Sequence, residues 1–138
     1  MSEQNKAVAR KFYQEFFDNK NINALEEVCS PDFVDHSPMP GMAGGLQGMR
    51  DMMGIFQKAF PDMKTHIEDM ISEGDLVATR FHITATHSGS MSGETPTGKQ
   101  ITFHGMDWIS FKDGKATGAW HQGDEGMVLG SLGVKPPA

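Results

Sequence analysis

The sequence predicts an α+β fold, in which helices cover one face of a curved antiparallel or mixed sheet. Apolar residues recur at helical spacing through residues 1–60, and from residue 63 onward they alternate as they do in strands. The predicted strands are also long, about eleven residues against a typical ~5–6. A sheet of such long strands must twist and coil. We therefore expect it to form a cone whose open end holds a cavity.

Three helices are predicted before the strands. The first carries Val8, Phe12 and Phe16 on one face, and the third ends at Pro61. A shorter second helix and a brief extended stretch lie between them. The expected bounds are from Asn21 to Ser30 for the second helix, residues 33–36 for the extended stretch and 46–60 for the third helix.

Four strands and a short last helix are predicted in the second half. Val, Thr, Phe and Ile are frequent there, and turn residues at 74–75 and 112–115 indicate hairpins. Residues 88–99 are rich in glycine and serine and are predicted to be a loop. The expected strands are residues 63–73, 76–87, 100–111 and the stretch after 115 through Trp120, followed by a helix over 125–132.

Length, charge and cysteine content exclude several classes of protein. The 138 residues fit one domain, residues 1–138, and the net charge of −6 without a basic cluster argues against nucleic-acid binding. No apolar run approaches the ~20 residues of a membrane helix, so no membrane partner is expected. The first residues lack the apolar stretch of a signal peptide, and the lone Cys29 cannot form an internal disulfide. We therefore expect a cytoplasmic protein.

Six histidines are the side chains best suited to chemistry in this chain. No two of them form an H-x-H pair on a strand or an H-x-x-x-H pair on a helix, so no metal site is predicted. The sequence also lacks a phosphate-binding glycine loop, a nucleophile turn and a dinucleotide fingerprint. What remains is acid–base chemistry by histidine and aspartate, or binding alone. The histidines are His36, His66, His82, His87, His104 and His121.

Alternation along the third strand divides its side chains between two faces. The face with Ile101 is a plain core face. We expect the opposite face, with His104, Met106 and Trp108, to line the cavity. Asp107 falls opposite His104, and we expect it to be a cross-strand or surface partner.

Three further charged or titratable residues are candidates for catalysis or substrate binding. His121 and Asp124 follow the fourth strand, and they cannot both face the cavity unless a bulge intervenes, for which Gly123 is suited. Asp124 is either catalytic or the cap of the last helix. Arg80 lies on a polar strand face, where it either anchors an anionic substrate group or pairs with an acid outside.

Several short motifs follow one another along the chain. They are Phe33-Val34-Asp35-His36-Ser37-Pro38, Ala59-Phe60-Pro61-Asp62, Gly74 to Arg80, Ala85 to Gly89, Pro96 to Lys99, Lys112 to Lys115, Trp120-x-x-x-Asp124 and Leu129 to Gly133. In that order and spacing they resemble the SnoaL-like polyketide cyclases, also called ester cyclases. The resemblance covers roughly residues 8–134.

The resemblance implies a SnoaL-like, cystatin-like α+β barrel of the nuclear-transport-factor-two-like superfamily. Members of this family close a ring by intramolecular aldol condensation on an aromatic polyketide ester, by acid/base catalysis without metal or cofactor. Their acid/base aspartate lies near the tryptophan that matches Trp120, so it corresponds to His121 or Asp124, with His104 as the partner. The expected pocket residues are His36, Met106, Trp108, Trp120 and Arg80.

The sequence therefore predicts an enzyme that performs aldol ring closure or related enolate chemistry on a small apolar or aromatic carbonyl ligand. The resemblance also implies a homodimer or higher oligomer that forms through the outer face of the sheet. Two alternatives stay open: a non-catalytic small-molecule-binding protein, and an isomerase or dehydratase on the same fold. Titratable groups that face each other inside the cavity favour an enzyme, whereas histidines that point outward favour binding.

Overall fold

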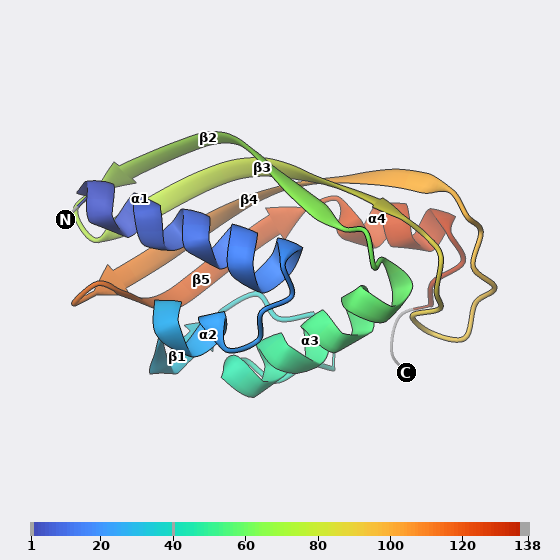
Figure 1. Ribbon diagram of the computed structural model, residues 1–138, viewed down its shortest axis with the longest axis horizontal. Coiled ribbons are helices and arrows are strands. Elements are labelled where there is room, and N and C mark those ends of the chain that lie inside the picture. The colour runs from blue at the N-terminus through green and yellow to red at the C-terminus, as the bar shows by residue number, and fades with distance from the viewer. Residues whose placement is uncertain (1, 40, 136–138) are drawn as a thin grey trace.

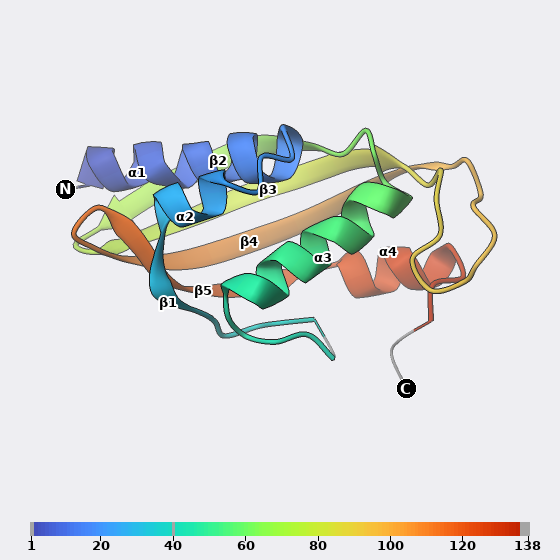
Figure 2. The same cartoon turned by 60° about the horizontal axis from the view of Figure 1, so that its bottom comes forward.

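Helices pack over one face of a curved five-stranded sheet in the computed structural model, which describes residues 2–39 and 41–135 (Figure 1). The elements are α1 (Ser2–Lys11), a π-helix η1 (Phe12–Asp18), α2 (Ala24–Val28), β1 (Cys29–Asp35), α3 (Leu46–Ala59), β2 (Lys64–Glu73), β3 (Leu76–Thr86), β4 (Gln100–Lys112), β5 (Lys115–Gly123) and α4 (Glu125–Ser131). Figure 2 shows α1 and α3 in front of the sheet and α4 beyond the end of β5. None of the helices in this part of the chain is long and apolar enough to cross a bilayer.

The sheet has the order β1-β5-β4-β3-β2 and confirms the predicted α+β fold class. The pairs among β2, β3, β4 and β5 are antiparallel, whereas β1 pairs with β5 in parallel. Sequence patterns predicted four strands, a helix ending near Pro31 and a brief extended stretch over 33–36; this stretch overlaps β1, which begins earlier, at Cys29. Proline is tolerated because β1 is an edge strand, and the register is irregular between Cys29 and Val34.

The first predicted helix changes its type part-way. At the end of η1 the Asn19 N–H donates to the Gln14 carbonyl, five residues back, at 2.9 Å. Stretches of π-helix frequently occur at functional sites. Here η1 carries Tyr13 and Phe16, which are buried against the sheet. Apolar spacing predicted a helix over these residues but does not distinguish a π-helix from an α-helix.

The hydrophobic core lies between the helices and the inner face of the sheet. Alternate residues of β3 and β4 supply one side of it, as period-two alternation requires. The helices and the residue after α3 supply the other side. The main contributors are Phe16, Leu25, Met53 and Phe60 from the helical layer, and Val77, Phe81, Phe103, Ile109 and Phe111 from the strands.

A buried polar pair fastens the loop over residues 88–99 to the end of β3. The His87 side chain is fully buried, and its Nε2 lies 2.7 Å from a carboxylate oxygen of Glu94. The same carboxylate accepts backbone N–H bonds from Met91 and Ser92. Burial by itself would raise the pKa of the Glu94 carboxyl, but these bonds hold that pKa well below its usual value.

Replacing Glu94 with glutamine is expected to lower the free energy of unfolding by about 1–3 kcal/mol, because buried donors lose their charged acceptor. Urea unfolding at neutral pH measures this loss. Glu27→Gln is the matched control, since Glu27 pairs with Lys11 on the surface and its replacement should change stability very little. Equal effects of the two substitutions would contradict a stabilising role for the buried pair.

Candidate functional site

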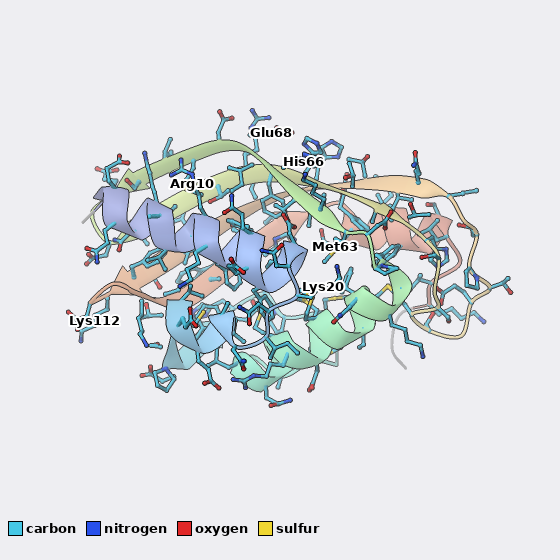
Figure 3. All side chains as sticks on the ribbon, viewed as in Figure 1. Arg10, Lys20, Met63, His66, Glu68 and Lys112 are labelled. Carbon is cyan, nitrogen blue, oxygen red and sulfur yellow. The ribbon has the colours of Figure 1, made fainter. Side chains whose placement is uncertain are left out.

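A cavity of about 140 Å³ lies between α3, η1 and the inner face of the sheet. Its volume is close to that of an engineered cavity of ~150 Å³ that binds benzene. Figure 3 shows Met63, one of its lining residues, between α3 and the sheet. Methionine is flexible and polarizable, so a wall rich in methionine adapts to the shape of a ligand. The lining methionines are Met39, Met49, Met52, Met53 and Met63, and the lining phenylalanines are Phe12, Phe17, Phe56, Phe81 and Phe103.

Four polar side chains form a network at one wall of this cavity. Asp107 on β4 lies opposite His121 on β5, and its Oδ1 is 2.6 Å from His121 Nδ1. The other carboxylate oxygen of Asp107 accepts a hydrogen bond from the Tyr13 hydroxyl at 2.7 Å. On the far side of the ring, His121 Nε2 lies 2.8 Å from Oε1 of Glu125, in the first turn of α4. The network therefore runs from Tyr13 through Asp107 and His121 to Glu125.

The two carboxylates hold His121 in its protonated form. Burial by itself would lower the pKa of His121, but the hydrogen bonds and charges of Asp107 and Glu125 outweigh burial and raise this pKa to about 10. Burial would raise the pKa of Glu125, whereas its bond to His121 lowers it. The pKa of Tyr13 is raised by burial and by Asp107, so its hydroxyl stays a neutral donor. At neutral pH this wall carries an imidazolium between two carboxylates.

Two glycines leave room for the His121 ring. A Cβ atom on Gly105 would lie 2.9 Å from His121 Cε1, and a Cβ atom on Gly123 would lie 3.0 Å from its Nε2. Both distances are shorter than ordinary contacts with a side chain. The backbone N–H of His121 donates to the Ser37 hydroxyl at 3.1 Å, which ties the residues after β1 to β5. The ring is therefore fixed by its backbone surroundings as well as by the network.

The three residues predicted to be catalytic fall into two separate groups. His121 faces the cavity, whereas Asp124 does not line it. Gly123 pairs in register with Gly105, so the strand has no bulge there and alternation turns Asp124 away from the His121 side. The Asp124 carboxylate accepts the backbone N–H of His104 at 2.7 Å and makes no side-chain cap on α4. His104 borders the cavity, but its side chain is 64% exposed.

Four residues predicted for the pocket lie instead on the outer face of the sheet or beside it. Met106, Trp108 and Trp120 are 58%, 49% and 43% exposed. The ring of His36 stacks on Trp120 with ring centroids 4.1 Å apart. None of the four lines the cavity. The cavity was predicted on the wrong face of β4. The inner face, which was expected to form only the core, also forms the cavity wall.

Arg80, the fifth residue predicted for the pocket, also lies on the outer face. Its guanidinium pairs with Glu68 at 2.7 Å and with Asp69. Figure 3 shows Glu68 and His66 projecting from β2, away from α1 and α3. The rings of His66 and His82 stack here, 4.6 Å apart, and His82 Nδ1 lies 2.7 Å from Glu68. Across residues 2–39 and 41–135, no three His, Cys, Asp or Glu side chains converge as metal ligands would.

Three members of the network were not predicted to be catalytic or pocket residues. Asp107 was expected to be a cross-strand or surface partner; it is the cross-strand partner of His121, inside the cavity. A signal was present, since Asp107 is charged yet alternates with the apolar Ile109 on the core face. Tyr13 and Glu125 had no comparable signal, because only the packing of η1 and α4 brings them to the sheet.

Comparison with known proteins identifies the family. The model of the SnoaL-like polyketide cyclases matches residues 7–130. The chain belongs to this family. Comparison with curated proteins finds no match.

Solved structures place SnoaL-like relatives on the same fold. Wild-type IdmH from Streptomyces antibioticus, named a "putative polyketide cyclase", is 30% identical over 95% of this chain and 99% of that chain, with a TM-score of 0.82. A Bacillus cereus protein with the same description is 29% identical over 95% and 81% of the two chains, also at 0.82. AclR from Streptomyces galilaeus, named a "putative hydroxylase", is 28% identical over 99% and 89%, at 0.83. Because proteins of similar structure and sequence carry different activity names, the likeness establishes the fold more firmly than the reaction.

Proposed function

We propose that this SnoaL-like protein binds a small apolar or aromatic carbonyl compound in the cavity and catalyses enolate chemistry on it, such as intramolecular aldol ring closure. One observation carries the proposal: the His121 imidazole is held between Asp107 and Glu125 at the wall of an apolar cavity. These two partners raise its pKa to about 10, which favours the charged form. Charges act more strongly on a substrate at an apolar wall than in bulk water, and these groups are already oriented.

The reaction sets modest demands on the protein. A proton on carbon between two carbonyls is already fairly acidic, so catalysis needs orientation, stabilisation of the enolate and one acid/base group. The His121 imidazolium can donate a hydrogen bond to the enolate oxygen, as donors in an oxyanion hole do. Asp107 and Tyr13 keep the ring oriented and charged, in the way that a third group orients the base of a catalytic triad.

Exchange of the proton between the two carbonyls with deuterium from D2O tests the proposal. Methyl benzoylacetate and related β-keto esters are the probes, and NMR measures the exchange rate with and without protein. We expect acceleration above the buffer rate, with the largest effect for esters whose aromatic group fills the cavity. Binding of these esters without any acceleration across the panel would refute the proposed reaction.

The same apolar lining supports a second candidate function, the binding of a small molecule without turnover. Both ring nitrogens of His121 already have partners, as they would in a network that serves only to stabilise the fold. Calorimetry with the same esters separates the two functions, because a binding protein would show affinity without exchange.

We further propose that the outer face of the sheet mediates self-association. Its side chains Met106, Trp108 and Trp120 are apolar and at least 43% exposed. Trp108→Glu is expected to weaken a dimer about tenfold or more, because a tryptophan at an interface often contributes ~2 kcal/mol or more. Sedimentation equilibrium measures the dimer constant. Met127→Glu on α4, where Met127 is 76% exposed, is the control and should leave it unchanged. A wild-type protein that stays monomeric would refute this interface.

A further inference from the structure

We propose that Glu125 is the proton acceptor of this site and that the substrate separates it from His121; this inference rests on the enolate chemistry proposed above. Glu125 belongs to α4 and lines the cavity. One of its carboxylate oxygens lies 2.8 Å from His121 Nε2. A hydrogen-bond donor and a carboxylate acceptor therefore stand side by side at the cavity wall.

The other candidates for the acceptor are already engaged. Asp107 uses one carboxylate oxygen for His121 and the other for the Tyr13 hydroxyl. His121 carries a proton on both ring nitrogens at neutral pH, so it has no lone pair to offer. Asp124 does not line the cavity and accepts the backbone N–H of His104. The Glu125 carboxylate, in contrast, contacts one side chain among the described residues, His121, through one of its oxygens.

Asp35 is the remaining carboxylate at the cavity. It accepts the backbone N–H of Ser37 at 2.9 Å, and no hydrogen bond found among the described residues joins it to His121. The carbonyl oxygen of a substrate and the carbon that loses the proton are only two bonds apart. The acceptor must therefore lie next to the donor that binds the oxygen, a condition that Glu125 meets through its contact with His121.

In the proposed step, His121 and Glu125 separate, and each interacts with a different atom of the substrate. The carbonyl oxygen replaces Oε1 of Glu125 as the acceptor of the His121 Nε2–H bond. The released carboxylate takes the proton from the carbon, the C–H electron pair forms the C=C bond of the enolate, and the negative charge on oxygen faces the imidazolium. In ring closure the enolate carbon then attacks a ketone, and the protonated Glu125 returns its proton to the new alkoxide. No further reactant is required.

Glu125→Gln is the decisive variant, because the proposed role of Glu125 predicts opposite changes in two measurements on it. Deuterium exchange of methyl benzoylacetate should become ~10²–10⁴-fold slower, since the general base is lost. Binding of 4-nitrophenolate, an analogue of the enolate, should become about tenfold tighter, because the neutral amide imitates the protonated acid and removes a negative charge. Asp51→Asn, an exposed carboxylate of α3 that bonds Gln47, is the matched control and should change neither measurement.

Each outcome of this pair of measurements decides the proposal. Slower exchange with tighter phenolate binding supports it. Unchanged exchange, or losses of both exchange and binding, overturns it, because damaged packing would lower both. A larger loss of exchange in Asp35→Asn would transfer the role to Asp35 and overturns it as well. If the wild type exchanges no ester, the proposed enolate chemistry is refuted independently of the role of Glu125. In that case, unchanged phenolate affinity in Glu125→Gln would overturn the role of Glu125 as well.

Discussion

Replacing His121 with asparagine is expected to slow deuterium exchange of a β-keto ester by roughly 10³-fold. Asparagine still donates a hydrogen bond, but it carries no positive charge, and hydrogen bonds from charged donors are about twice as strong as neutral ones. The loss is large because the cavity lining is mostly apolar, and a charge acts more strongly there than in bulk water. The measurement compares exchange rates of wild type and variant at equal concentrations of folded protein.

Asp124→Asn provides the comparison that separates the two acid/base assignments left open by the sequence. Asp124 bonds to His104 and does not line the cavity, so we expect a much smaller loss of exchange than for His121→Asn. Circular dichroism of both variants checks that the fold is retained. A loss for Asp124→Asn as large as for His121→Asn would contradict the assignment to the cavity-facing residue.

Most of the fold could be predicted from local patterns. The β2–β3 and β4–β5 hairpins turn at Gly74 and Gly114, which adopt positive φ angles of 58° and 79° that glycine accommodates readily. Pro61 ended α3 close to its predicted limit. Only the second half of β1 was predicted, as the extended stretch over 33–36; its first half pairs with β5, a distant part of the chain, and Pro31 conceals it in the local pattern.

The candidate site was harder to predict, for a physical reason. Alternation sorted the residues of β4 into the correct two groups, but it does not say which group faces inward. Met106 and Trp108 put large apolar side chains on the outer face as well, so hydrophobicity did not decide between the two faces. The contact between Tyr13 and Asp107 spans 94 positions of the sequence, and only tertiary packing brings these residues together.

The stability of the protein should fall as the pH rises from about 7 to above 10, because of His121. Its pKa is raised from 6.5 to about 10 by the bonds and charges of Asp107 and Glu125, against the opposing effect of burial. A raised pKa means that the folded state binds the proton more tightly than the unfolded chain does. The resulting stabilisation is complete below the unfolded pKa and is lost as the pH rises through the folded pKa.

The size of this loss follows from the shift and from the exposure of the ring. One pKa unit corresponds to about 1.4 kcal/mol, and because the His121 side chain is 31% exposed, solvent screening should reduce the total to roughly 2–3 kcal/mol. Urea unfolding of wild type and His121→Asn at pH 7, 8.5 and 10.5 measures it, and the difference between the two proteins should shrink by this amount. Burial raises the pKa of the Cys29 thiol to about 12, so Cys29 adds its own loss of stability at high pH, but this loss is the same in both proteins and cancels in their difference. A constant difference would mean that His121 is uncharged at pH 7, which would remove the imidazolium on which the proposed stabilisation of the enolate depends.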